Sequence, residues 1–191
     1  MDLTCKKGGL VKQGHGSIRD ECGMMASLAW TGICKEPVLR HGIDGSPGLV
    51  ADLKVQGVWD GERPAFFDNR VVNADAASYV SRDWPTISQQ AANTKHAKYD
   101  RACEDLRGSF TPLVVSCDGA LHREYETFLK RLANTLSEKW SKPYSQVALW
   151  VRVKTQFSVI RAVSLRLRGP RRQVRGLGLE DGAAIGLHGE D

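Results

Sequence analysis

The chain has 191 residues, a length that supports one hydrophobic core and is short for two domains. Its composition, 41% hydrophobic and 26% charged, is that of a globular protein, and it lacks the run of about 18 apolar residues that a membrane span requires. The first residues show no basic start followed by an apolar core, so no secretion signal is predicted. Five cysteines without a C-x-x-C pair favour reduced thiols in an intracellular protein over a disulfide framework.

Positive charge is concentrated near the C-terminus. Residues 139–179 contain ten Lys or Arg and no Asp or Glu, so the other 150 residues carry a net charge of −5 although the whole chain carries +5. Such a block suits a polyanionic partner, because neutralising phosphates releases condensed counterions. A solvated basic helix followed by a tail gives the same pattern, so the charge alone leaves both interpretations open.

A first helix is predicted over residues 17–31. Residues 1–16 are rich in Gly and Lys and are predicted to be flexible, whereas Ser17 can cap a helix and Asp20 stands where a capping box places an acid. The apolar residues then fall on one side of the helix: Ile18, Cys22, Met25, Leu28 and Ala29. Glu21 lies within this arc, and a carboxylate there needs a partner because burying it alone is costly. It is either an edge residue that reaches water or an additional acidic ligand for a metal.

Two strands with acidic residues are predicted next, over residues 49–59 and 65–73. Residues 32–48 are predicted to be a connector, and residues 60–64 have the composition of a turn. Alternation along the first strand gives one face with Asp52, Lys54 and Gln56 and another with Ala51, Leu53, Val55 and Trp59. The second strand places Phe66, Asp68, Arg70 and Val72 on one face, and Asn69 with Phe67 and Val71 on the other. A pair of solvated strand faces with a cross-strand charge pair is the simpler interpretation of these acids; a metal site is the other.

The remaining elements alternate helix and strand. After irregular residues 74–85, helices are predicted over residues 86–106, 123–140 and 145–168, with a strand over residues 111–117. Lys95 and Lys98 are neighbours on one helical face, which is either solvated or functional. The last helix has a predicted apolar stripe of Leu149, Val153, Phe157, Ile160, Val163 and Leu167. Beside it lies a basic line that can follow a phosphate backbone: Lys154, Arg161 and Arg168, continued by Arg171 and Arg172 in a predicted flexible tail, 169–191.

This order predicts one α/β (α+β) domain over residues 17–168, in which a mixed sheet is flanked by helices and followed by a long basic C-terminal helix.

Several short motifs resemble one family. Ala51-Asp52-Leu53 and Phe67-Asp68-Asn69-Arg70 resemble the PD-(D/E)xK pattern of restriction-endonuclease-like nucleases, with Ala in place of Pro and Arg in place of Lys. In chain order, residues 5–10, 15–21, 95–99 and 110–119 are similar to the motifs C-x-x-G-G-L, H-x-x-[IV]-R-D-E, K-x-x-K-Y and F-T-P-x-V-V-S-x-D-G. These motifs occur in the endonuclease region at the C-terminus of reverse transcriptase polyproteins from non-LTR retrotransposons.

The resemblance implies a divalent-metal-dependent DNA endonuclease, or a remnant of one, with a restriction-endonuclease-like fold. Asp52 and Asp68 would hold Mg²⁺ or Mn²⁺, with Glu21 as an additional acid. Arg70 cannot abstract a proton, because arginine stays charged at neutral pH, and would hold a phosphate oxygen. Nucleic acid would be bound by the remaining cations of the pattern: Lys95, Lys98, Lys154, Arg161, Arg168, Arg171 and Arg172.

The partner implied by the resemblance is DNA, possibly RNA as well, and the expected location is the nucleus. No zinc is expected, because Cys5 and His15 supply at most two of the four ligands of a zinc knuckle, which makes residues 1–16 a remnant of that region. Asn69 places an amide among core positions, which costs stability unless the amide is paired. A non-catalytic nucleic-acid-binding fragment is the alternative function.

Overall fold

The computed structural model describes the backbone of residues 10–42 and 47–175, and the side chains of residues 16–42 and 47–165. In chain order the elements are α1 (Leu10–Ala29), β1 (Cys34–Lys35), β2 (Val38–Arg40), β3 (Leu49–Val50), β4 (Leu53–Gln56), β5 (Pro64–Val72), the 3-10 turn η1 (Ala77–Tyr79), α2 (Trp84–Asp105), β6 (Ser109–Ser116), α3 (Arg123–Trp140) and α4 (Tyr144–Arg175). The described helices include none that is both long and apolar enough to cross a membrane.

A mixed four-stranded sheet in the order β1-β4-β5-β6 forms the centre of the fold. β4 pairs antiparallel with both β1 and β5, whereas β5 and β6 are parallel and are connected through α2. β2 and β3 form a separate two-stranded sheet. The predicted mixed α/β class is therefore confirmed.

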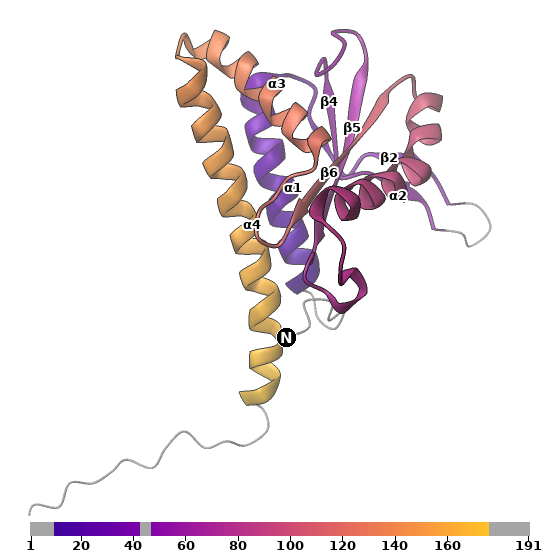
Figure 1. The fold of residues 1–191 in the computed structure, drawn as a ribbon. Helices are drawn as coiled ribbons and strands as arrows, with labels where there is room; N and C mark the ends of the chain where they lie inside the picture. The colour runs from indigo at the N-terminus through magenta and orange to yellow at the C-terminus, as the bar shows by residue number, and fades with distance from the viewer. Residues whose placement is uncertain (1–9, 43–46, 176–191) are drawn as a thin grey trace, which may run out of the picture.

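Helices cover both faces of the sheet (Figure 1). Phe66 of β5 and Phe110 of β6 pack with Tyr99 of α2 on one face. On the other face, Phe67 and Leu113 pack in one large core with residues of α1, α3 and α4. Most residues of β5 and β6 are buried on both faces, and β5 carries the polar run Asp68-Asn69-Arg70 between apolar residues.

The predicted first strand is divided in the structure. β3 belongs to the small sheet and β4 to the large one, with a bend at Asp52 between them. Because of this bend, Ala51 packs on the α2 side and Leu53 on the α1 side, so the prediction that they share a face was wrong. Trp59 lies in the following turn, where its Nε1 donates to Thr111 Oγ1 at 3.1 Å. The predicted connector, residues 32–48, contains β1 and β2.

Two helices are longer than predicted. α1 begins at Leu10 rather than Ser17, so residues 10–16 are helical and not a flexible remnant. α4 continues through Gly169 and Pro170 to Arg175, so the first part of the predicted tail is helical as well. Leu28, predicted on the buried side of α1, is exposed. The predictions for residues 1–9, including Cys5, and for residues 176–191 lie outside the described residues.

Four members of the predicted apolar stripe of α4 face solvent, whereas Val163 packs partly against the core and the side chain of Leu167 lies outside the described residues. Leu149, Val153, Phe157 and Ile160 are all exposed. The side that packs against α1 and α3 carries Val147, Val151, Thr155, Ser158, Val159 and Ala162. Thr155 and Ser158 can be buried there because their hydroxyls donate to the carbonyls of Val151 and Thr155 within the same helix, at 2.9 and 2.7 Å.

Candidate active site at the β4–β5 hairpin

Asp68 is the centre of a polar cluster between β5 and α2. It lies on the face of β5 that α2 covers and is 5% exposed. Lys95 Nζ donates to its Oδ2, and the hydroxyl of Tyr99 donates to its Oδ1 at 2.7 Å. Lys95 and Tyr99 are four residues apart on α2 and therefore point from the same side of the helix. The helix thus supplies a cation and a hydroxyl donor to one buried carboxylate.

Tyr99 also connects this cluster to Lys98. The Lys98 Nζ donates to the Tyr99 hydroxyl at 3.1 Å and lies 4.6 Å from the centre of its ring. Burial raises the pKa of Tyr99, and the negative charges of Asp68 and Asp52 raise it further. The phenol therefore remains protonated and keeps its role as a donor to Asp68.

Asp52 lies in the bend before β4, opposite Asp68. Leu53 pairs with Phe67 across the antiparallel ladder, so Asp52 and Asp68 occupy the next pair of positions. Asp52 Oδ2 accepts from the backbone nitrogen of Asn69 at 2.6 Å and from Asn69 Nδ2 at 3.1 Å. The register therefore brings the two predicted metal-binding acids to adjacent strands, with Asp52 oriented by Asn69.

The amide of Asn69 is paired rather than isolated in the core. The residue is 1% exposed and lies on the α1 side of the sheet, as predicted from alternation. Cys22 Sγ lies 3.9 Å from Asn69 Oδ1 and 3.1 Å from the Tyr125 hydroxyl. Burial raises the pKa of the Cys22 thiol to about 12, so it stays protonated. A short chain of polar contacts thus links Asp52 to α1 and α3.

Glu21 finds its partner on α4. Its Oε1 is buried and has no hydrogen-bond partner among the described residues, but Lys154 Nζ lies 3.4 Å away. The Lys154 ammonium is also 5.9 Å from the ring centre of Trp150. Lys154, which the sequence placed on a phosphate-binding surface, therefore lies at the contact between α1 and α4 and neutralises Glu21.

The other predicted site residues are spread over the molecule. Arg70 is half-buried on β5, two residues after Asp68 and opposite Val114 of β6. Arg161 is exposed on α4. Arg168, Arg171 and Arg172 lie within α4, but their side chains are outside the described part of the structure.

The donor set of this site fits magnesium or manganese. Two carboxylates on neighbouring strands supply oxygen ligands and leave the remaining positions to water and phosphate, as Mg²⁺ prefers. Within the described residues no group of three or more His, Cys, Asp or Glu side chains is placed to hold a metal ion.

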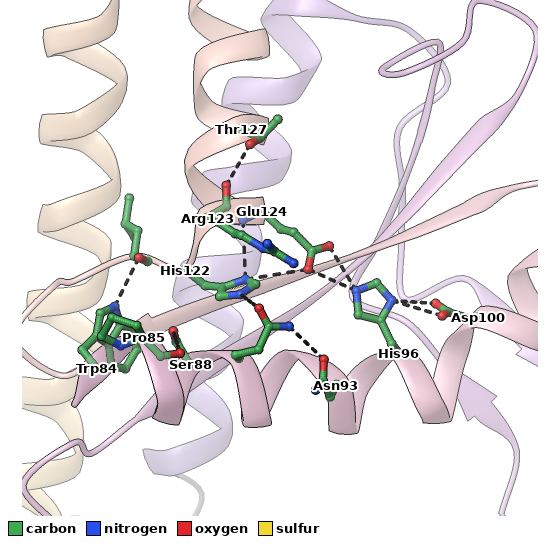
Figure 2. A network of polar contacts seen from close by, with 12 residues as sticks. Trp84, Pro85, Ser88, Asn93, His96, Asp100, His122, Arg123, Glu124 and Thr127 are labelled. Atoms are coloured by element: carbon green, nitrogen blue, oxygen red, sulfur yellow. Dashed lines mark hydrogen bonds and ion pairs between the residues drawn. The ribbon is translucent and has the colours of Figure 1, made fainter. Parts of the chain in front are cut away.

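A second polar network, which the sequence did not predict, joins α2 to the start of α3 (Figure 2). His96 Nδ1 lies 2.9 Å from Asp100 Oδ1, and His96 Nε2 lies 3.1 Å from Glu124 Oε2. His122, which caps α3, is 3% exposed, with its Nδ1 3.8 Å from Glu124 Oε1. The spacing of four between His96 and Asp100 was the available signal, because such residues are neighbours on a helix.

No protein-family model matches the chain, and no curated protein is significantly similar to it in sequence.

Proposed function

We propose that the β4–β5 hairpin and α2 form the active site of a divalent-metal-dependent DNA endonuclease of the restriction-endonuclease-like type, related to retrotransposon endonuclease regions. The contact between Lys95 and Asp68 is the observation that carries this proposal. The two residues are 27 positions apart and belong to two separate motifs of the resemblance, the acidic hairpin and K-x-x-K-Y. Their contact brings residues of the two motifs into one cluster, as expected if both motifs belong to one site.

The division of roles follows from the contacts. Asp52 and Asp68 would hold the ion, which when bound supplies Lewis acidity to the scissile phosphate and a more acidic water. Asn69 orients Asp52, and Tyr99 orients Asp68. Lys95 stands beside Asp68, where its ammonium can bind a phosphate oxygen as negative charge develops.

The remaining cations supply affinity. Lys98 is exposed beside Tyr99, and Arg70 is half-buried on the strand of Asp68, so both suit contacts with phosphate oxygens. The basic residues of α4 would strengthen binding to DNA without reading its sequence. A DNA substrate in turn implies a nuclear location.

A non-catalytic nucleic-acid-binding protein is the second candidate, and the burial of Asp68 favours it. The carboxylate is 5% exposed and already neutralised by Lys95, which is also the arrangement of a purely structural buried ion pair. In that case Asp68 would hold α2 on the sheet, and only the surface cations would contact nucleic acid.

Cleavage of supercoiled plasmid in the presence of Mg²⁺ or Mn²⁺ separates the two functions. We expect the wild-type protein to nick the plasmid, and Asp68→Asn, which keeps a side chain of the same shape, to lower the rate by about 100-fold or more. DNA affinity should stay nearly unchanged in this variant, because the cations that hold the phosphates are intact.

Glu104→Gln is the matched control, since it removes an exposed acid of the same helix outside the site. Calorimetric titration with Mn²⁺ should show a binding site that Asp52→Asn and Asp68→Asn lose and Glu104→Gln keeps. Nicking by Asp68→Asn at the wild-type rate would contradict the proposal. DNA binding by the wild-type protein without cleavage under either metal would favour the non-catalytic function.

A further inference from the structure

The outward face of α4 is unusually apolar. Leu149, Val153, Phe157 and Ile160, which we call the α4 stripe, are 63%, 42%, 55% and 56% exposed. Successive members are three or four residues apart and therefore lie on one side of the helix. α4 forms the outer edge of the molecule, so the stripe points away from the sheet (Figure 1). A solvated helix normally carries polar residues on this side, and a contiguous apolar patch indicates an interaction surface.

At its N-terminal end the stripe continues into a groove. The groove has a volume of about 630 Å³ and lies where the ends of α1 and α3 meet the start of α4, lined by Leu28, Trp140, Lys142, Gln146, Val147 and Trp150. The rings of Trp140 and Trp150 meet edge to face there, with 5.3 Å between their centres. Gln146, Leu149, Trp150 and Val153 follow the helical spacing i, i+3, i+4, i+7, so the groove and the stripe form one elongated surface.

The charged residues that α4 and the preceding turn contribute beside this surface are positive. Arg152 lies along one side of the stripe and Arg161 along the other, with Lys142 in the groove. Residues 139–179 contain no Asp or Glu at all. Two copies of the chain that met through their α4 stripes would bring these cations together, and α4 itself supplies no acid to pair with them, which disfavours self-association.

We propose that the α4 stripe and its groove bind an amphipathic helix whose apolar face is flanked by Asp and Glu. Such a helix would place apolar residues at i, i+3, i+4 and i+7 against the stripe, and its acids would pair with Arg152 and Arg161. This binding activity is independent of the proposed nuclease.

Two other anionic partners fit the surface less well. A DNA backbone would satisfy the arginines but offers no apolar surface to cover Leu149 and Phe157. An anionic bilayer offers both charge and apolar depth, but it is flat, whereas a helix can lie along the stripe and fill the groove beside it.

The test is binding of a fluorescent designed peptide of about 21 residues, three heptads with Leu at the core positions and Glu beside them. We expect the double variant Phe157→Gln, Ile160→Gln to weaken its binding by at least about tenfold, because it replaces two of the four apolar side chains of the stripe with polar ones. The control Val80→Gln, at a position that is 72% exposed directly after η1, should bind like the wild type. A peptide with Lys in place of every Glu should bind at least about tenfold more weakly than the Glu peptide.

Several results would overturn the proposal. These are equal binding of the Lys and Glu peptides, no binding of the Glu peptide at about 1 mM, or unchanged binding by the double variant. Loss of binding to phosphatidylserine vesicles or to duplex DNA in the double variant, with peptide binding unaffected, would assign the surface to a membrane or to nucleic acid. A dimer in sedimentation velocity that the double variant abolishes would assign it to a second copy. If the double variant is unfolded by circular dichroism, Leu149→Gln, which alters an equally exposed member of the stripe, replaces it.

Discussion

At the scale of single residues, Asn69 determines how the first candidate acid is held. Its backbone nitrogen and its Nδ2 both donate to Asp52 Oδ2, while its Oδ1 faces Cys22. An apolar residue in its place would leave Asp52 with one donor fewer in a half-buried position. Asn69 is therefore a positioning residue, although its place among core side chains makes it look like a defect in the sequence.

We expect Asn69→Val to lower the free energy of unfolding by about 1–3 kcal/mol, because it removes one partner of a buried hydrogen bond. Urea denaturation measures the change. Asn93→Ala, at an exposed position of α2 where Asn93 accepts from Gln89 Nε2, should change it by less than about 0.5 kcal/mol. If Asn69→Val were as stable as the wild type or more stable, the Asn69 amide would not contribute to the stability of the fold.

His96 makes the contact between α2 and α3 dependent on pH. Burial of the ring lowers the pKa of His96, but hydrogen bonds to Asp100 and Glu124 raise it by more, so the net pKa is above its ordinary value. A histidine with a raised pKa in the folded state stabilises the protein fully below its unfolded pKa, about 6.5, and loses this contribution as the pH rises through the folded pKa. Protonated His96 thus donates from Nδ1 to Asp100 of its own helix and from Nε2 to Glu124 of α3, which joins the two helices (Figure 2).

The difference in unfolding free energy between the wild type and His96→Gln should therefore be largest near pH 5.5 and shrink toward about pH 8.5. Urea denaturation across this range measures it. Burial lowers the pKa of His122, which gives the opposite pH dependence, but His122 is present in both proteins, so its contribution largely cancels in the difference. A difference that is constant or grows with pH would contradict a protonated His96.

At the scale of elements, composition and the spacing of apolar residues identified most helices and strands. They did not identify which side of α4 is buried. The boundaries of α2, β6 and α3 were predicted to within two residues, because each has a clear apolar period and a clear end. α4 has apolar residues around most of its circumference, so the period alone could not select the buried side. The buried side contains Thr155 and Ser158, which look polar in the sequence but satisfy their hydroxyls within the helix.

The start of β6 depends on close packing at Gly108. A Cβ added there would lie 2.5 Å from Phe66 Cε2 and 2.8 Å from the Pro64 carbonyl oxygen. Because the carbonyl belongs to the paired strand β5, it cannot move without disturbing the sheet. We expect Gly108→Ala to cost about 1–3 kcal/mol of stability, measured by urea denaturation.

Gly61→Ala is the matched control, because a Cβ at Gly61 would have no heavy atom within 4 Å. Gly61→Ala should change the free energy of unfolding by no more than about 0.5 kcal/mol. Similar unfolding curves for the two variants would mean that the strand junction adjusts more freely than its contacts indicate.

At the scale of the whole molecule, the sequence predicted which segments carry the candidate site but not how they are held. The strand register did not follow from the predicted turn at residues 60–64, because strands that end at 59 and resume at 65 would place Asp52 opposite Val72, whereas Leu53 pairs with Phe67 and Asp52 lies opposite Asp68. The pairing of Lys95 with Asp68 and of Glu21 with Lys154 could not be predicted either, because each joins elements far apart in the chain. The bend at Asp52 was also hidden, since alternation assumes a continuous strand.

The separation of charge between the C-terminal block and the rest of the chain leads to a prediction for DNA binding. Arg161 is exposed, whereas Lys154 pairs with Glu21, so of these two cations it is Arg161 that can bind a phosphate without losing another partner. Arg161→Gln should reduce the slope of log affinity against log salt by about 0.9 on duplex DNA, the value of one phosphate contact. Lys154→Gln should leave the slope nearly unchanged. Fluorescence anisotropy over a range of salt concentrations measures both slopes, and a reversed order would place the DNA on the other side of α4.

The open turn between β4 and β5 divides the candidate site between two stretches of chain. Asp52 and Glu21 precede the turn, while Asp68 with Lys95 and Tyr99 follows it, inside the continuous unit β5-α2-β6. Gly61 in this turn has free space around it, so an interruption of the chain there disturbs no packed side chain. A protein split at this point would hold one candidate ligand on each fragment. Metal binding would then report reassembly of the two fragments, which makes the turn a natural place for a split sensor.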